Sequence, residues 1–384
     1  MDLIAAGQYV LKKLCESGYE AYFIGGMVRD QWLGRPIYDI DITTSAKPDV
    51  VQSLFEQTLD IGKAHGTITV MIEKLPIEVT TYRVESDYSD YRHPNQLAFT
   101  TSLYEDLLRR DFTINAIAKN LEGQLYDPLN GLEDLKHKRL RAVGQASLRF
   151  KEDPLRMLRA LRFVSKLEFQ LEKETYLGIQ EQRHLLKHLA KERVKKELTG
   201  LMEGPARNQG LTYGFTTGVF EEFEDFSHLK KYETYSFKPL DQGLDYFVLA
   251  GLETKDIQAF LNRWPLSKEE KKLIKLMKEL VEAPKCQAYI QYRFGMKAAH
   301  LYHRVTAFLQ QEVNAFVPCE LVIRSRKDLD IRAAEVLQLS SRPKGPWLGQ
   351  LLEQIEFEVI TGQLMNEKLA ILEFVKQQGA LYEE

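Results

Sequence analysis

The stretch from Tyr22 to Thr44, YFIGGMVRDQWLGRPIYDIDITT, constrains the fold more than any other part of the chain. It opens with an apolar run at 22–24 that has the size and composition of a buried strand. Gly25 and Gly26 follow, and paired glycines let backbone N–H groups approach a phosphate closely because no Cβ intervenes. A helix that begins behind them adds partial positive charge. This segment therefore predicts a strand, a turn and a helix arranged to bind an anion.

Residues 38–42 close the stretch with strict alternation of acidic and apolar side chains. Alternation along a strand places Asp39 and Asp41 on one face and the isoleucines on the other. Two carboxylates about 7 Å apart along a strand can share hard divalent cations with a triphosphate. A glycine pair or an Asp-x-Asp motif alone is weak evidence, but their close spacing here indicates a metal-dependent nucleotidyl-transfer site.

Length and composition limit the classes to which the chain can belong. A chain of 384 residues is long enough for more than one domain. The formal net charge of −3 gives no global basic field, so any contact with RNA must come from local patches. The three cysteines are scattered and lack metal-ligand spacing, which indicates a reducing, cytoplasmic compartment. The N-terminal pattern is an amphipathic helix instead of a signal peptide, and no apolar run is long enough to span a membrane.

Periodicity predicts the remaining elements of the N-terminal part. Residues 1–20 and 47–59 have helical patterns, and residues 67–72 and 77–82 have strand patterns. Residues 83–106 are polar and rich in tyrosine, with a proline in the middle. This composition predicts an irregular connection, which is either a plain surface loop or a lid near the site.

Further charged residues are candidates for the same site. Glu78 either approaches the metals as a further carboxylate or forms a structural ion pair, and we favour the ion pair. Arg109 and Arg110 lie between apolar residues, and their planar forks of donors suit phosphate oxygens. Asp111 has the position of an N-cap or first turn of a short element, and Asn115 that of a local brace.

From residue 149 onward nearly every segment has a helical pattern, which places a domain boundary near residue 145. One i+3 row on the first of these helices consists of Asp153, Arg156, Arg159 and Arg162. A second row, expected to be buried, consists of Leu155, Leu158, Leu161 and Val164. The arginines then point into a cleft, where a polyanion is the natural counter-charge because like charges repel. The alternative is an exposed helix with Asp–Arg pairs along its own surface.

These motifs resemble those of class II tRNA nucleotidyltransferases, the CCA-adding enzymes, of the type found in bacilli. The matching pieces are GGMVRD at 25–30, DID at 39–41, HGTITV at 65–70, RRDFTINA at 109–116, EDPLRMLRALRF at 152–163 and ERVKKEL at 192–198. The resemblance implies an α+β fold, in which a nucleotidyltransferase-fold head with a mixed sheet and helices precedes an all-α neck, body and tail in a seahorse shape. The implied parts are residues 1–145, 146–203, 204–310 and 311–384.

The resemblance also implies an activity, the addition of C, C and A to the 3′ end of tRNA from CTP and ATP with release of pyrophosphate. It implies two-metal catalysis, with Mg²⁺ held by the catalytic residues Asp39 and Asp41. The implied nucleotide-binding residues are Gly26, Arg29, Arg110, Asp153, Arg156, Arg159 and Arg162. Body and tail are expected to hold the acceptor stem and TΨC arm of tRNA, and no membrane or obligate protein partner is expected.

Asp153 and Arg156 provide a hydrogen-bond acceptor beside a donor. Cytosine and adenine each present an amino donor beside a ring-nitrogen acceptor, whereas uracil and guanine reverse that order. A site built on these bonds can reject a mismatch by ~10⁴ or more in favourable cases. The sequence therefore predicts that the protein itself selects C and A without a nucleic-acid template.

Three kinds of rival function remain open at the level of sequence. A bacterial poly(A) polymerase usually has a Gly-Arg-Arg-Phe-like stretch and a basic tail, whereas this chain has GKAHG at 62–66 and ends in ALYEE. A partial enzyme adds only CC or only A; CC-adding enzymes tend to have a shortened loop where this chain has residues 83–106, and an A-adding enzyme is harder to exclude. The third rival is a tRNA-binding protein without activity, which has no need of two exposed carboxylates near RNA phosphates.

Overall fold

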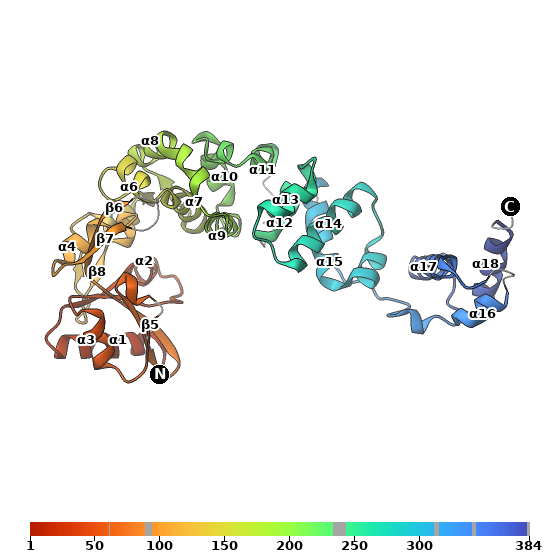
Figure 1. Ribbon diagram of the computed structural model, residues 1–384, viewed down its shortest axis with the longest axis horizontal. Coiled ribbons are helices and arrows are strands. Elements are labelled where there is room, and N and C mark those ends of the chain that lie inside the picture. Colours follow the sequence, from red (N-terminus) through yellow and green to blue (C-terminus); the bar gives the residue numbers. More distant parts are fainter. Residues whose placement is uncertain (61, 89–93, 233–242, 311–314, 340–342, 382–384) are drawn as a thin grey trace. The chain divides into compact units, whose positions relative to one another are not determined.

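The computed structural model describes residues 1–60, 62–88, 94–232, 243–310, 315–339 and 343–381. The chain divides into two compact units (Figure 1). The first consists of Met1–Pro239 with Arg263–Pro265, and the second of Leu240–Asn262 with Leu266–Glu384. The segments predicted as head and neck thus lie in one compact unit. The predicted four-part division is finer than these two units and stays a prediction.

A mixed sheet forms the centre of the N-terminal part. Among the described residues its strand order is β3-β4-β5-β2-β1-β8-β9, in which β2 and β5 are parallel and all remaining neighbours antiparallel. The strands are β1 (Ala21–Ile24), β2 (Asp41–Thr44), β3 (Thr58–Leu59), β4 (Thr67–Ile72), β5 (Leu75–Thr81), β8 (Ala118–Lys119) and β9 (Leu125–Tyr126). The strands predicted at 22–24, 67–72 and 77–82 are confirmed. The third starts two residues earlier because Glu73 and Lys74, with φ of 48° and 71°, form a two-residue turn.

Helices cover this sheet through apolar side chains. Helices α1 (Leu3–Glu16) and α3 (Pro48–Leu54) contact it, and both are shorter than the helices predicted at 1–20 and 47–59. Helix α1 stops before Gly18, whose φ of +87° a glycine adopts without strain. Alternation along β1 directs Phe23 toward α1, whereas Ile24 packs in a cluster with residues of α4 (Leu103–Leu108). Strand β1 is therefore anchored on both faces.

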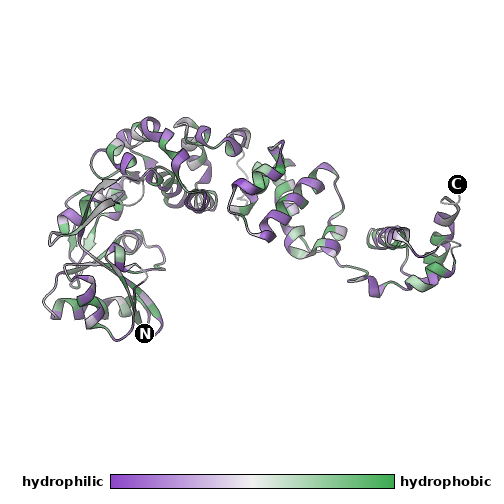
Figure 2. Ribbon diagram, viewed as in Figure 1, coloured by the Kyte–Doolittle hydropathy of each residue, from purple (hydrophilic) through white to green (hydrophobic). Residues whose placement is uncertain are grey.

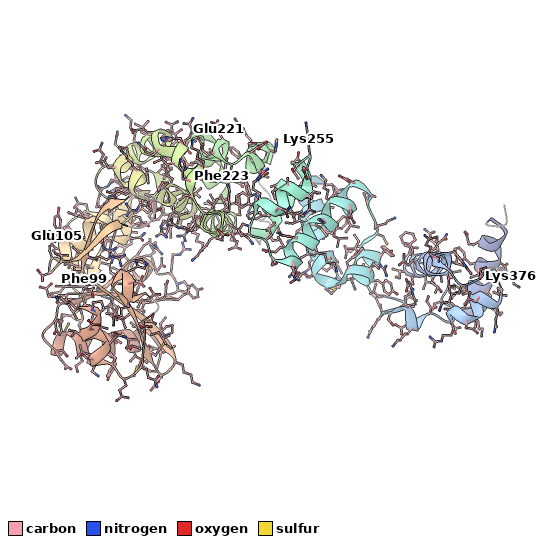
Figure 3. The ribbon with its side chains drawn as sticks, in the orientation of Figure 1. Phe99, Glu105, Glu221, Phe223, Lys255 and Lys376 are labelled. Carbon is pink, nitrogen blue, oxygen red and sulfur yellow. The ribbon has the colours of Figure 1, made fainter. Side chains whose placement is uncertain are left out.

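Most of the described residues within 83–106 lie in two strands and the start of α4, so the predicted irregular connection is wrong there. Strands β6 (Arg83–Tyr88) and β7 (Pro94–Phe99) form a separate antiparallel pair. The proline that argued against a strand is the first residue of β7, a position where a missing N–H is tolerated. Phe99, labelled in Figure 3, packs against Gly66, where a Cβ would lie 2.9 Å from its ring. Residues 89–93 lie outside the described part, and a lid role stays a prediction.

The helix predicted across residues 152–163 is interrupted. Helix α6 (Ala146–Glu152) ends at Asp153, and α7 (Leu155–Leu167) begins after Pro154. Proline disfavours helical backbone in the residue before it, and Asp153 accordingly has φ −134° and ψ 98°. Asp153 therefore lies at the junction of two helices, and its predicted place in a helical row with the three arginines is wrong. The apolar row of α7 is buried as predicted.

Among the described residues, the first unit has further helices beyond α1, α3, α4, α6 and α7. They are α2 (Gly26–Trp32), α5 (Gly131–Lys136), α8 (Lys173–Gln182), α9 (Lys191–Met202), α10 (Arg207–Thr216) and α11 (Glu224–Ser227). Helices α9 and α10 contact α7 directly. A short parallel pair, β10 (Arg139–Leu140) and β11 (Gln170–Leu171), links the segment after the sheet to the chain after α7.

Helices make up most of the chain after residue 242 in the described ranges, and the segment 315–332 is mainly irregular. The helices are α12 (Gly243–Glu253), α13 (Ile257–Arg263), α14 (Lys268–Glu282), α15 (Gln287–Gln310), α16 (Ala333–Gln338), α17 (Pro346–Ile360) and α18 (Lys368–Leu381). Hydrophobic and hydrophilic residues are mixed along the helices (Figure 2). Within the described residues, no helix combines the length and the apolar character needed to cross a membrane. The observed fold is therefore the predicted α+β arrangement of a mixed sheet followed by helices.

Candidate nucleotide-binding and metal site

The Gly25–Gly26 turn borders both predicted metal ligands. Gly25 has φ +70°, and a Cβ there would lie 3.4 Å from Asp41 Oδ2 and 3.7 Å from Arg110 Nη1. A Cβ on Gly26 would lie 3.9 Å from Asp39 Oδ1 and 3.6 Å from Arg29 Nη2. Glycine at these positions thus leaves room between two carboxylates and two guanidinium groups. The structure brings together all five residues that the sequence placed in the head.

The two carboxylates differ in environment. Strand β2 begins at Asp41, so Asp39 precedes the strand and is exposed, which corrects the prediction that both lie on one strand face. Glu78 of β5 is the registered neighbour of Asp41 across the parallel pair. Burial, together with the nearby charges of Glu78 and Asp39, raises the pKa of Asp41 to about 6, although Arg110 opposes the shift. The carboxylates of Asp39, Asp41 and Glu78 therefore bring more negative charge to this site than Arg110 neutralises.

Such a carboxylate pair fits a divalent cation. In the described part of the chain, no group of three or more His, Cys, Asp or Glu side chains is arranged to hold a metal by itself. Mg²⁺ is commonly bound by one or two carboxylates together with substrate phosphates, because it dehydrates reluctantly. Asp39 and Asp41 supply that number of ligands, and hard carboxylate oxygens suit the ion. A complete cage is thus expected only when a phosphate-bearing ligand is present.

Arg110 is positioned by a carboxylate that sequence reasoning missed. Asp106 of α4 is fully buried and pairs with Arg109 at 2.8 Å and with Arg110 at 3.2 Å. It also accepts a hydrogen bond from Thr43 of β2. Nε of Arg110 is buried and has no hydrogen-bond partner among the described residues. The unpaired Nε makes this guanidinium costly to bury, and its Nη1, which lies beside Gly25, is placed to donate to a ligand oxygen.

A chain of hydrogen bonds connects Arg29 to the helical part. Arg29 forms a bidentate pair with Asp30 and donates to Asn115 Oδ1 at 2.7 Å. Asn115 Nδ2 donates to Asp111 Oδ1 at 3.0 Å, and Arg159 of α7 donates twice to Asp111 Oδ2. Asn115 is the predicted brace. Asp111 is an ion-pair partner instead of the predicted N-cap, because Phe112 occupies the N-cap position of the short helix that follows.

The electrostatics of Asp111 favour its charged form. Burial by itself raises the pKa, but the Arg159 ion pair and the Asn115 hydrogen bond outweigh burial and lower the pKa to about 2. The carboxylate of Asp111 is therefore ionised under all ordinary conditions. It fixes the first turns of α7 against the segment that carries Arg110.

The arginines of α7 have protein counter-charges. Arg162 Nε donates to the buried Glu197 of α9 at 2.5 Å, and Arg159 pairs with Asp111. Arg156, only 7% exposed, donates to Glu152 and to the backbone carbonyls of Arg149 and Arg109. The expectation that a bound polyanion supplies the counter-charge for the whole row is therefore wrong. Asp111 and Glu197, which are distant in sequence, and Glu152, four residues before Arg156, supply it. Their predicted contacts with the nucleotide stay predictions.

Two partners were missed for different reasons. Glu197 lies among the buried residues Val194, Leu198 and Leu201 of α9, so a charged residue on an apolar helical stripe was a readable signal. Arg193 of the same helix donates to both carboxylate oxygens of Asp153, at 3.1 and 3.4 Å. No local pattern identifies that pair, because 40 residues separate the two.

The matching protein families cover three segments. Residues 21–141 match a family described as "Poly A polymerase head domain", and residues 168–228 one described as "Probable RNA and SrmB- binding site of polymerase A". Residues 246–375 match "tRNA nucleotidyltransferase domain 2 putative". The first segment contains the glycine turn and both carboxylates, and the second contains Arg193 and Glu197.

Similar proteins agree with these families over nearly the whole length. A CCA-adding enzyme of Lactococcus lactis subsp. cremoris (strain MG1363) is 38% identical, with 96% of this chain and 95% of the relative covered. One of Bacillus subtilis (strain 168) is 39% identical, with 96% and 97% covered. The crystal structure of the Bacillus stearothermophilus CCA-adding enzyme in complex with CTP matches with a TM-score of 0.82 at 30% identity, covering 100% of this chain and 99% of that one. The chain therefore belongs to the family of CCA-adding enzymes.

Proposed function

We propose that this chain adds C, C and A in sequence to the 3′ end of tRNA, using CTP and ATP and no nucleic-acid template. The observation that carries the proposal is the arrangement around the glycine turn. Asp39, Asp41, Arg29 and Arg110 converge on Gly25 and Gly26 within one compact unit that also contains α7. The relatives of this chain are CCA-adding enzymes, and the one from Bacillus stearothermophilus binds CTP.

The chemistry is attack of the tRNA 3′-hydroxyl on the α-phosphate of the incoming nucleotide, with pyrophosphate leaving. Nucleotidyltransferases generally use divalent metal ions, and we propose Mg²⁺ on Asp39 and Asp41. When bound there, Mg²⁺ lowers the pKa of the attacking hydroxyl and stabilises the leaving group. Arg110 and Arg29 orient the triphosphate by hydrogen bonds, and the glycines allow it to approach the backbone.

Base selection is assigned to the junction of α6 and α7. Arg156 uses three of its five N–H groups on protein acceptors, so Nε and one N–H of Nη2 have no acceptor among the described residues. Asp153 Oδ2 accepts one bond from Arg193 and keeps a second lone pair. The junction thus retains a donor and an acceptor for the edge of cytosine or adenine. Uracil and guanine would leave both unpaired, which is a strong penalty in a desolvated site.

Transfer RNA is the proposed second substrate, contacted through its acceptor stem and TΨC arm by the helices after α9. A full CCA-adding activity is favoured over an A-adding enzyme because the relatives are CCA-adding enzymes. The segment 83–106, in which β6 pairs with β7, also lacks the shortening that CC-adding enzymes tend to have. A poly(A) polymerase and an inactive tRNA-binding protein are the two competing functions, and the retained carboxylates argue against the second.

One incubation distinguishes full CCA addition from A addition, poly(A) synthesis and binding without activity. Three tRNA substrates, lacking CCA, CA or A, are each incubated with the chain, Mg²⁺ and labelled CTP or ATP, and product lengths are read on a sequencing gel. Full restoration of all three supports the proposal. Extension of only the substrate that lacks A identifies an A-adding enzyme, long A tracts identify a poly(A) polymerase, and no extension refutes the proposal.

A variant tests the role of the junction. Asp153→Ala is expected to relax the discrimination against UTP and GTP, whereas metal binding persists because Asp39 and Asp41 belong to the sheet. Unchanged discrimination in this variant would refute the role of Asp153.

A further inference from the structure

We propose that Arg193 is a positioning residue for base selection, which it controls by fixing the carboxylate of Asp153. The inference rests on the proposed function, because it assigns Arg193 a role only if Asp153 reads the nucleotide base. Arg193 itself is not required to touch the nucleotide. Its effect is to decide where the acceptor oxygen of Asp153 points.

Asp153 needs such a partner because no helix constrains it. It follows the last residue of α6 and precedes Pro154, and its backbone is extended. An aspartate at such a junction can rotate about both side-chain torsions, and a rotation moves each oxygen by more than the tolerance of a hydrogen bond. Selection of one base edge over another requires that the acceptor stay within about 0.5 Å of its place.

Two contacts hold the carboxylate. The backbone N–H of Leu155 donates to Oδ1 at 3.1 Å, and Arg193 Nη2 donates to Oδ2 at 3.1 Å and to Oδ1 at 3.4 Å. The Arg193 and Asp153 side chains are 23% and 19% exposed, so solvent competes only weakly with the pair. Together the contacts fix both torsions of Asp153 from two directions.

The arrangement leaves one acceptor position in a defined direction. A carboxylate has about four lone-pair positions, and three are occupied by Leu155 and the bifurcated Arg193 bond. The fourth belongs to Oδ2 and matches the single exocyclic amino group of cytosine or adenine. Without Arg193 the carboxylate of Asp153 can rotate. Its oxygen can then accept a hydrogen bond from uracil or guanine, whose donor and acceptor stand in the opposite order.

A purely structural role makes a different prediction. Arg193 joins the start of α9 to the α6–α7 junction, and if it served only that packing, its loss would slow the reaction with every nucleotide alike. Control of Asp153 instead changes the ratio of correct to incorrect nucleotides. The ratio of kcat/KM values is therefore the decisive readout, and total activity is not.

The test uses the full-length chain with Arg193→Gln and Arg193→Lys. For each, kcat and KM are measured with CTP and UTP on tRNA lacking CCA, and with ATP and GTP on tRNA lacking A. We expect Arg193→Gln to lower the CTP:UTP and ATP:GTP ratios of kcat/KM at least tenfold, mainly through a higher KM for the correct nucleotide. Arg193→Lys keeps one charged donor and is expected to recover part of the ratio.

A matched control and a double variant separate the explanations. The matched control is Arg183→Gln, which removes another arginine of the same unit. Arg183 pairs with Glu221, which is labelled in Figure 3, and with Glu222. This variant is expected to keep the parental ratio of kcat/KM values. In an Asp153→Ala background, Arg193→Gln is expected to change the ratio no further, because it acts through Asp153.

Each outcome has a defined meaning. A parental chain that adds no nucleotide overturns the proposed function. If the parental chain discriminates between nucleotides, two results overturn the role of Arg193 alone. One is an unchanged kcat/KM ratio in Arg193→Gln, and the other is a further loss of that ratio when Arg193→Gln is added to Asp153→Ala. If circular dichroism shows that Arg193→Gln does not fold, Arg193→Lys is used in its place. A parental ratio of kcat/KM values in Arg193→Lys then overturns the inference.

Discussion

Replacement of Asp111 by asparagine is expected to loosen the contact between α7 and the segment that carries Arg110. The carboxylate accepts one bond from the backbone N–H of Phe112, one from Asn115 and two from Arg159, and its side chain is 10% exposed. An asparagine side chain has nearly the same shape, but its amide N–H₂ would face the guanidinium of Arg159. A guanidinium has no hydrogen-bond acceptor to pair with that donor. The variant therefore leaves Arg159, whose side chain is 33% exposed, without its nearest counter-charge.

The magnitude follows from two estimates. A pKa of about 2, against an ordinary value of 3.8, corresponds to about 2.5 kcal/mol of preference for the ionised carboxylate in the folded state. Removal of one partner of a fully buried ion pair costs more, about 3–5 kcal/mol. That range is an upper bound here, because water solvates the exposed third of the Arg159 side chain. A loss in the range of these two values is expected for Asp111→Asn.

Hydrogen exchange measures this loss locally, which matters because the chain forms two compact units and a single unfolding transition is not assured. Amides in 109–116 and 155–167 are expected to lose protection by roughly a hundredfold or more. Amides of α14 serve as the control and are expected to be unchanged. The double variant Asp111→Asn with Arg159→Met is expected to be less destabilised than Asp111→Asn alone, since no buried charge is left unpaired. A change below tenfold in the Asp111→Asn variant would refute the reasoning.

The same ion pair has a pH signature. Because the folded pKa of Asp111 is below its unfolded value, its stabilisation is complete above about pH 4 and disappears as the pH falls toward 2. The difference in protection between the parental chain and Asp111→Asn is therefore expected to narrow through that interval. A difference that stays constant from pH 5 to pH 2 would show that the charge of Asp111 is not its cause.

Three further outcomes are expected. Asp41→Ala should lower kcat for CTP addition by about 10³-fold or more while the affinity for tRNA, measured by filter binding, changes less than twofold; retained turnover would remove Asp41 from the chemistry. Chelation with EDTA should stop addition and excess Mg²⁺ should restore it, and activity in the chelator would contradict a metal-dependent site. Gly204→Ala should lower the melting temperature, at a cost of about 1–3 kcal/mol, because its Cβ would lie 2.1 Å from Ser165 Oγ. Gly349→Ala in α17, with nothing within 4 Å of that Cβ, should be neutral or stabilising by about 0.5–1 kcal/mol, and equal losses in the two variants would refute the steric argument.

Local patterns in the sequence were sufficient for the elements that local physics determines. Strand β1, the glycine turn and the apolar row of α7 follow from side-chain periodicity and from backbone freedom, and the structure confirms them. The break at Asp153 was also available from the sequence, because Pro154 disfavours helix in the residue before it. The pairing of β6 with β7 could not be predicted from the sequence, because these polar strands lack the alternation that marks a half-buried strand.

Contacts between distant residues were beyond the reach of periodicity. Asp111 lies 48 residues before Arg159, and Glu197 lies 35 residues after Arg162. A row of like charges on a helix is consistent with a bound polyanion and equally with acidic residues from elsewhere in the fold. Only the packing of α7 against α9 and against the segment after α4 decides between the two.

The distribution of these counter-charges ranks the arginines as phosphate ligands. Arg159 and Arg162 each face a largely buried carboxylate of the protein, so a triphosphate would have to compete with bonds already formed. Arg110 shares Asp106 with Arg109, its Nε is buried without a partner among the described residues, and its Nη1 lies 3.7 Å from the place of a Cβ on Gly25. A phosphate oxygen at that position forms a new bond without breaking one, which makes Arg110 the strongest candidate among the three. The predicted contacts of Arg159 and Arg162 with the nucleotide stay predictions, and their ion pairs with Asp111 and Glu197 hold α7 against its neighbours.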